Sequence, residues 1–182
     1  MLNIILIAIA VVVVLFVLIV ALRPSQFRVS RSARMSAPPD WIFPHVNELH
    51  KWEAWNPWGK LDPNTKLVYD GPPAGVGATY SWAGNNQVGE GRSTIVNSKP
   101  NERVLLRLDF AKPMKATNMA EFTFVPDGSQ TVVTWTMTGK NNFVGKAFGL
   151  FINCDKMCGG QFEKGLAAMK SLVETNIAAE KS

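Results

Sequence analysis

The chain has 182 residues and a formal net charge of +5, and its basic excess lies close to the N-terminal end. Without Arg23, Arg28, Arg31 and Arg34, fifteen basic residues face fourteen acidic ones, so the bulk of the chain is nearly neutral. A nucleic-acid-binding module is expected to carry a basic patch within its folded part. The charge distribution therefore argues against a nucleic-acid partner.

Residues 1–24 predict a transmembrane anchor. The run Leu2–Leu22 contains one polar side chain, Asn3, and no charge, and about 20 apolar residues are enough for a helix to cross a bilayer. A cleaved signal peptide is the alternative, but its apolar region usually spans only about 7–15 residues, follows basic residues and ends at small ones. We therefore expect an uncleaved anchor, a single-pass membrane location and the lipid bilayer as a partner.

The charges beside the anchor predict which side of the membrane the rest of the chain occupies. All four arginines follow the apolar run, and basic flanks stay cytoplasmic. Residues 25–182 number about 150, which is enough for one domain with its own core. We expect one cytoplasmic domain there. The alternative is that three of the arginines merely form the solvent face of a first strand.

The next segments predict strands interrupted by short helices. Residues 25–35 alternate with a period of two, which is typical of a strand. Prolines then favour two short helical segments, at residues 39–49 and 49–55. Further strands are expected at residues 66–69, 78–83, 87–97, 103–110, 117–125 and 131–137, with hairpin turns at 84–86 and 126–129.

The pattern changes after Gly139. Residues 143–179 contain no proline and repeat apolar side chains at helical spacing, which predicts one long C-terminal helix. Gly159, Gly160 and Gly165 would each cost that helix about 1 kcal/mol against alanine, so we expect a close approach to the backbone or a bend. The whole order is typical of an α+β domain in which an antiparallel sheet curves around the last helix.

Four segments also carry a family resemblance: residues 36–43, the tryptophan-rich residues 49–58, the glycine-rich residues 75–78 and residues 131–135. Together they resemble the helix-grip superfamily of START and Bet v 1 domains (SRPBCC), in its bacterial polyketide cyclase/dehydrase-like branch. The resemblance covers roughly Phe27–Val173. It implies a helix-grip fold whose cavity, between sheet and last helix, holds lipids, sterols, polyketides or other hydrophobic small molecules. It also implies a bacterial inner membrane as the location.

Candidate cavity residues come from the strands and the last helix. Glu90 and Arg92 share the parity of two valines in their strand, and could orient a polar ligand head or perform acid–base chemistry if burial raised the pKa of Glu90. The alternative is an exposed cross-strand ion pair. The expected cavity residues are Trp82, Glu90, Arg92, Trp135, Phe151, Cys158 and Phe162.

Three tryptophans form a second candidate feature. Trp52, Trp55 and Trp58 are spaced three residues apart, so one helical face or turn can gather them. In one interpretation they are core residues that pin the short helices to the sheet. In the other they line a portal through which a ligand exchanges with the bilayer, since tryptophan favours sites with an apolar and a polar side.

The sequence carries no motif for a metal or a cofactor. Cys154 and Cys158 lack histidine or cysteine partners at zinc spacing and are expected to be free thiols, and no nucleotide-binding or nucleophile motif is present. The leading hypothesis is a membrane-anchored protein that binds or transports a hydrophobic small molecule or lipid. The alternatives are a cyclase or dehydratase with Glu90 as acid or base, and a co-chaperone-like interaction module with a filled cavity. The ligand and the oligomeric state are not determined by the sequence.

Overall fold

The computed structural model describes residues 1–150 and 154–180, and within them seven antiparallel strands form one sheet. The strand order is β1-β7-β6-β5-β4-β3-β2, so that β1 and β2 are the edges. Apart from β1, which closes on β7, each strand pairs with its neighbour in the sequence. The strands are β1 (Gln26–Met35), β2 (Lys66–Asp70), β3 (Thr79–Ala83), β4 (Glu90–Lys99), β5 (Arg103–Lys112), β6 (Ala116–Asp127) and β7 (Gln130–Lys140).

The helical segments lie at the two ends of the domain sequence and between β1 and β2. Pro39 and Pro44 each occupy the first turn of a short helix, where the missing N–H costs nothing and the fixed φ suits the helix. The segments are α1 (Leu2–Leu22), α2 (Pro39–Ile42), α3 (Pro44–Asn47), the 3₁₀ turns η1 (Leu49–Ala54) and η2 (Pro57–Lys60), α4 (Phe143–Phe148) and α5 (Cys154–Glu180).

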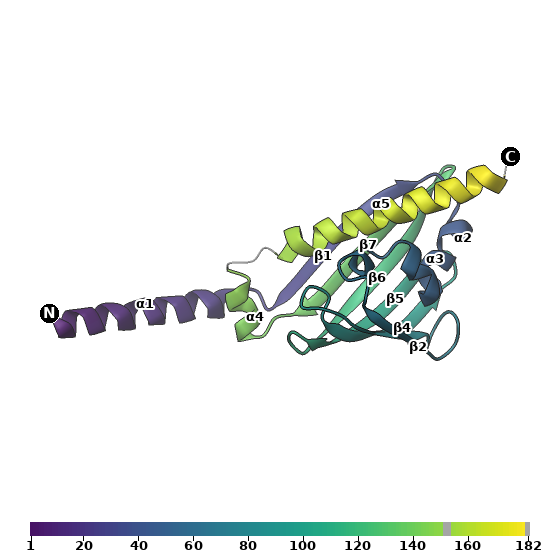
Figure 1. The fold of residues 1–182 in the computed structure, drawn as a ribbon. Coiled ribbons are helices and arrows are strands. Elements are labelled where there is room, and N and C mark those ends of the chain that lie inside the picture. Colours follow the sequence, from purple (N-terminus) through teal and green to yellow (C-terminus); the bar gives the residue numbers. More distant parts are fainter. Residues whose placement is uncertain (151–153, 181–182) are drawn as a thin grey trace.

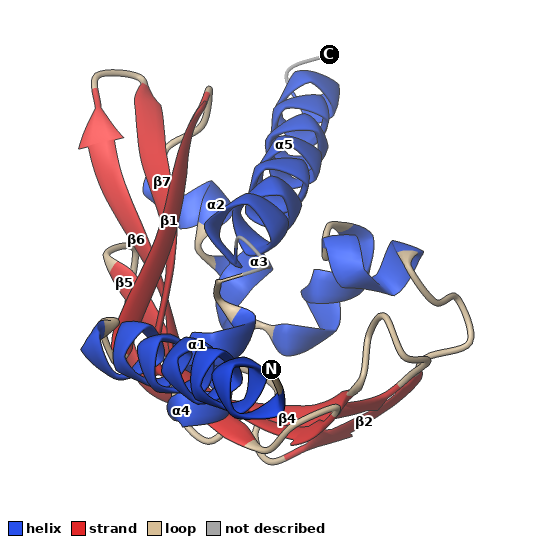
Figure 2. Cartoon of the chain, turned by 90° about the vertical axis from the view of Figure 1, so that its left-hand side faces the viewer, coloured by secondary structure: helices blue, strands red, loops and turns tan. Residues whose placement is uncertain are grey.

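The sheet curves strongly, and α5 lies on its inner side. Figure 2 shows β1, β7 and β6 on one limb of the curve and β4 and β2 on the other, with α5 and the short helices between them. The helix packs chiefly on β1 and only touches β7, η1 and η2. The predicted α+β architecture, with a curved sheet around a long C-terminal helix, is therefore confirmed. Because α5 covers one limb only, the inner face of the other limb is free to line a cavity.

The core follows the alternation of the strands and one face of α5. Inward residues of the central strands and helix residues four or three positions apart are fully or almost fully buried, as expected for a sheet face and an amphipathic helix. These residues are Val104, Leu106, Phe122, Phe124 and Val133 from the strands, and Phe162, Leu166, Met169 and Val173 from α5.

Two glycines of α5 allow close approaches to the helix backbone. A Cβ at Gly159 would overlap the guanidinium of Arg31 on β1, and a Cβ at Gly165 would lie 3.0 Å from both Pro57 and Trp135. Space at Gly160 is open, so no contact requires a glycine there. The close approach predicted for these helix glycines thus occurs at two of the three.

Arg31 holds the start of α5 against β1. Its Nε donates to Glu163 Oε1 at 2.6 Å, and Nη1 and Nη2 donate to the carboxylate of Asp155 at 3.0 and 2.9 Å. The guanidinium therefore spans Gly159 and joins acids that lie on either side of that residue in the helix. This arrangement differs from the expected alternative of a purely solvent-facing arginine.

We predict that this contact makes stability depend on pH. Hydrogen bonds from Arg31 lower the pKa of Asp155 below its ordinary value near 3.8, so the stabilisation is present above that value and is lost as the pH falls through the lowered pKa. An Arg31→Gln variant should show a smaller difference between its urea midpoints at pH 7 and pH 3 than the parent protein. Arg34→Gln, on the exposed face of the same strand, is the control and should behave like the parent. Equal pH dependence in all three proteins would contradict the prediction.

The predicted single C-terminal helix is divided in the structure. The side chain of Asn142 caps α4 by accepting from the backbone N–H of Gly145 at 2.8 Å, and α4 ends at Phe148, with Gly149 as its C-cap. Gly149 and Leu150 form a turn after α4, and this turn interrupts the helical pattern across residues 143–179. The segment 151–153 lies outside the described residues.

The short helix α4 lies beside the end of α1 (Figure 1). Lys146 Nζ donates to the carbonyl of Ala21 at 3.3 Å, and the N–H of Asn141 donates to the carbonyl of Ser25 at 2.7 Å. Among the described residues, α1 is one helix that is long and apolar enough to cross a membrane, a property that signal sequences share. It projects from a soluble domain, with Val20 buried at its base.

Candidate functional site: an apolar cavity under the last helix

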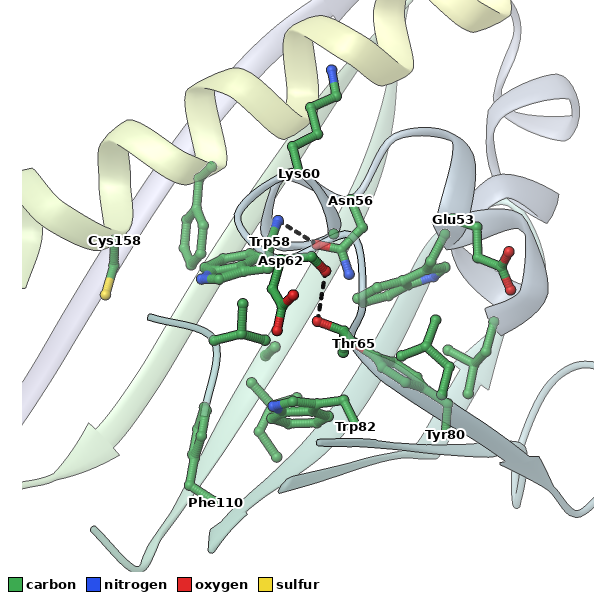
Figure 3. A pocket seen from close by; sticks show the side chains of 18 of the residues that line it. Glu53, Asn56, Trp58, Lys60, Asp62, Thr65, Tyr80, Trp82, Phe110 and Cys158 are labelled. Atoms are coloured by element: carbon green, nitrogen blue, oxygen red, sulfur yellow. Dashed lines mark hydrogen bonds between the residues drawn. The ribbon is translucent and has the colours of Figure 1, made fainter. Parts of the chain in front are cut away.

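A cavity of about 410 Å³ lies between the curved sheet, the first turns of α5 and the segment that connects η1 to β2. Its floor is formed by inward side chains of β3, β5, β6 and β7. Its walls are formed by Cys158 and Phe162 of α5 and by Trp52 and Trp58 of the 3₁₀ turns. Figure 3 shows Trp82, Phe110 and Cys158 arranged around the same space. The strand residues of the floor are Tyr80, Trp82, Leu108, Phe110, Ala120, Trp135 and Met137.

Stacked aromatic rings make one wall rigid. Trp135 stacks on Phe162 with a centroid distance of 4.2 Å and an interplanar angle of 9°, and on Phe122 at 4.7 Å. Trp58 meets Trp135 edge-on at 5.6 Å. Aromatic pairs in these geometries stabilise beyond their area burial. These contacts hold Trp135, Phe162 and Trp58 against one another in the wall.

Polar side chains gather on the side of the cavity formed by residues 53–65. The side chain of Asn56 accepts from the N–H of Trp58 at 3.1 Å, and Thr65 Oγ1 donates to the carbonyl of Asp62 at 2.8 Å (Figure 3). The carboxylate of Asp62 also accepts from the N–H of Asn85 at 2.7 Å, which joins this segment to the β3–β4 hairpin. These bonds order a segment that would otherwise be a flexible loop, and they place polar groups around an apolar interior.

Tyr80 supplies a buried polar group in the cavity wall. Burial raises the pKa of its phenol, while a hydrogen bond to the side chain of Asn56 acts in the opposite direction. The phenol is therefore neutral throughout the physiological range and can donate or accept a hydrogen bond. Beside it, Tyr69 donates to Glu53 Oε1 at 2.7 Å, and burial together with that bond raises the pKa of Tyr69.

Most of the expected cavity residues border the cavity. Trp82, Trp135, Cys158 and Phe162 line it, whereas Phe151 lies outside the described residues. Of the three clustered tryptophans, Trp52 and Trp58 line the cavity, while Trp55 is fully buried beside it. Trp52 and Trp55 are buried core residues, as the first interpretation expects, and Trp52 and Trp58 also border the cavity. A portal to the bilayer beside them stays a prediction.

Glu90 and Arg92 lie on the opposite face of β4, which corrects the expectation that they face the cavity. Glu90 accepts from Lys112 Nζ at 2.7 Å, and the exposed Arg92 donates to Ser81 Oγ at 3.1 Å. The valines that suggested their parity were misleading for two reasons. Val88 precedes the strand and is followed by Gly89 with φ +71°, and Val96 sits at a β-bulge between Ile95 and Asn97. Gly89 breaks the alternation between Val88 and Glu90. Val96 does share a face with Arg92, but it is the outer face, because Ser93 and Ile95 between them are buried and Val96 is exposed.

Several cavity residues were missed by reasoning from the sequence. Tyr80 shares the parity of Trp82 in β3, so the alternation that selected the tryptophan would also have selected the tyrosine. Leu108 and Phe110 follow Leu106 on the inward face of β5 in the same way. Asn56 and residues 59–65 carried no comparable signal, because their position depends on the fold of an irregular segment.

The curved sheet, the covering helix and the enclosed apolar space define a domain of the helix-grip class. The family model for "Polyketide cyclase / dehydrase and lipid transport" matches residues 26–174. The chain belongs to this family.

Solved structures share the fold at low sequence identity. A protein from Thermobifida fusca has a TM-score of 0.61 at 19% identity, with 80% of this chain and 92% of that chain covered. Protein CV1439 from Chromobacterium violaceum has a TM-score of 0.59 at 16% identity over 84% and 99% of the two chains. The Aha1 dimer from Colwellia psychrerythraea gives 0.55 at 16% identity over 79% and 96%. No curated protein matches the chain.

Proposed function

We propose that this protein binds or transports a hydrophobic small molecule or lipid while α1 anchors it in a membrane. The observation that carries the proposal is the cavity of about 410 Å³ with its largely aromatic and aliphatic lining. Ligand pockets commonly enclose about 300–1,000 Å³, mostly apolar with a few placed polar groups. Tyr80, Asn56 and the polar residues on the 53–65 side supply those groups here. The family description names lipid transport, which agrees with this class of ligand.

The cavity favours binding over the two alternative functions. An interaction module of the co-chaperone kind needs no internal space, whereas this domain has a ligand-sized, partly open pocket. A cyclase or dehydratase needs an acid or base beside its substrate, and Glu90, the residue expected to serve, pairs with Lys112 outside the cavity. The carboxylates that do line the cavity already bond within the protein: Glu53 accepts from Tyr69, and Asp62 accepts from the backbone N–H groups of Asn64 and Asn85. The basic residues after α1 support a cytoplasmic position of the domain.

The test is to identify what occupies the cavity of the full chain. The protein is transferred from detergent into nanodiscs of a single synthetic phospholipid and incubated with total lipid extract. Bound molecules are then identified by native mass spectrometry. We expect a hydrophobic ligand in roughly one-to-one ratio, displaced by a fluorescent fatty acid or sterol probe. Failure of every lipid and probe class to bind would contradict the proposal.

A further inference from the structure

One end of the sheet concentrates basic charge. Strand pairing places Gln26 opposite Lys140, Asn118 opposite Gly139, and Glu90 opposite Lys112, so the starts of β1, β4 and β6 and the ends of β5 and β7 lie together. We call this the anchor-proximal end, because α1 leaves the domain there (Figure 1). Residues 1–28, 110–118 and 137–150 contribute to it. Together with the start of β4, they hold six of the nineteen Lys and Arg residues and one of the fourteen Asp and Glu residues, Glu90, which pairs with Lys112.

The same end exposes large apolar side chains. Met114, in the β5–β6 turn, is 49% exposed, and Phe143 and Val144, in the first turn of α4, are 47% and 49% exposed. In water such exposure is unfavourable. Apolar side chains surrounded by lysine and arginine are typical of protein surfaces that enter the boundary between lipid headgroups and acyl chains.

Hydrogen bonds fix this surface relative to α1. Lys146 and Asn141 bond to the carbonyls of Ala21 and Ser25, and Arg23 donates to the carbonyl of Gly149 at 3.4 Å. The contacts hold α4 beside the last turn of the apolar helix. If α1 crosses a bilayer, α4 is therefore held at the depth where that helix leaves it.

We propose that the anchor-proximal end docks on the surface of an anionic phospholipid bilayer. Met114, Phe143 and Val144 enter the interface, and the lysines and arginines around them contact anionic headgroups. This inference rests on the proposed membrane anchoring. It also gives the cavity a source of ligand, because Val88, Phe110, Met137 and Cys158 extend the cavity lining toward this end. A lipid would then pass between bilayer and cavity without crossing bulk water.

Depth measurements on the full chain test the docking. Val144→Cys and Met114→Cys, each made with Cys154→Ser and Cys158→Ser, are labelled with an environment-sensitive fluorophore and reconstituted into phosphatidylcholine vesicles with or without 30% phosphatidylglycerol. Ser129→Cys, in the β6–β7 turn at the opposite end, is the matched control. Spin-labelled lipid should quench the labels at 114 and 144 on the order of twofold more than the label at 129, and more strongly in anionic vesicles.

Charge variants separate docking from mere proximity to α1. Lys112→Gln, Lys115→Gln and Lys140→Gln together should reduce the extra quenching. Lys51→Gln, Lys99→Gln and Lys170→Gln, which lie away from this end of the sheet, should leave it unchanged. Equal quenching at all three label positions, in a chain that resists extraction by alkaline carbonate, would overturn the docking and leave the anchor intact. Release of the chain by carbonate would overturn both. Ligand binding measured on the parent chain, which keeps Cys158, in the same vesicles reports on the cavity independently.

Discussion

Replacing Leu108 by tryptophan should weaken the binding of a hydrophobic ligand by at least about tenfold, equivalent to about 1.4 kcal/mol. Leu108 points inward from β5 and is only half-buried, because part of its side chain borders the cavity. An indole in this position would extend into the space that a ligand requires. The substitution acts by filling cavity space. A loss of affinity would therefore show that the ligand binds in the cavity. Displacement of a bound fluorescent fatty acid or sterol, measured in nanodiscs, reports the change.

Leu105→Trp is the matched control for this variant. Leu105 lies on the same strand, is also half-buried, and pairs with Glu121 on the opposite face of the sheet. The same substitution there adds equal bulk outside the cavity and should leave affinity within about twofold. Thermal unfolding of both variants shows whether either change disturbs the fold. If both bind as the parent does, the ligand does not occupy this cavity.

Regular alternation allowed the sequence to predict some strands well. In β1, Val29 and Met35 are buried as the period of two requires, and Arg31 shares their face. That face turned out to meet α5 rather than solvent, which an arginine can do when acids such as Asp155 and Glu163 receive its N–H groups. The sequence alternation therefore predicted which side chains of β1 share a face. The ion pairs of Arg31 could not be predicted in the same way, because they depend on where α5 packs.

Alternation failed where the backbone is irregular. Nothing in the residues around Ile95 and Val96 distinguishes a β-bulge from a continuous strand, yet the bulge reverses every side chain on one side of it. Val96 lies at this bulge and faces outward, as Arg92 does, so the assumption that the valine marks the inner face gave the wrong direction for Glu90 and Arg92. Bulges are set by partner strands and by the curvature of the sheet, so a single strand sequence does not contain them.

The cavity itself could be expected only through the family resemblance. Its volume depends on how far α5 stands from β3–β6, and this distance is set by contacts of the helix with β1 and η2. Gly159 admits Arg31 and Gly165 admits Pro57 and Trp135, so the helix lies close to one limb of the sheet and leaves the other uncovered. Local sequence propensities predict the individual helices and strands. The cavity arises from how α5 packs against the sheet, which these propensities do not determine.

Trp55, the most deeply buried member of the tryptophan cluster, should dominate the stability of the short helical segments. Trp55 is fully buried, and its Nε1 donates to the carbonyl of His45 at 2.9 Å. Its ring also contacts those of Trp52, Phe122 and Trp135, with centroid distances of 4.9 to 5.9 Å. Trp55→Ala would create a void and leave a buried carbonyl without its donor, so we expect a loss of about 3–5 kcal/mol in the free energy of unfolding.

Trp58→Ala is the informative comparison, because Trp58 is only half-buried and lines the cavity. Its removal should cost about 1 kcal/mol of stability but should weaken ligand binding, since the ring forms part of the cavity wall. Urea denaturation and ligand displacement measured on both variants separate the two roles. Similar stability losses would mean that the segment is pinned to the sheet by the whole cluster. A Trp58 variant that binds ligand normally would remove this tryptophan from the site and with it the case for a portal beside η2.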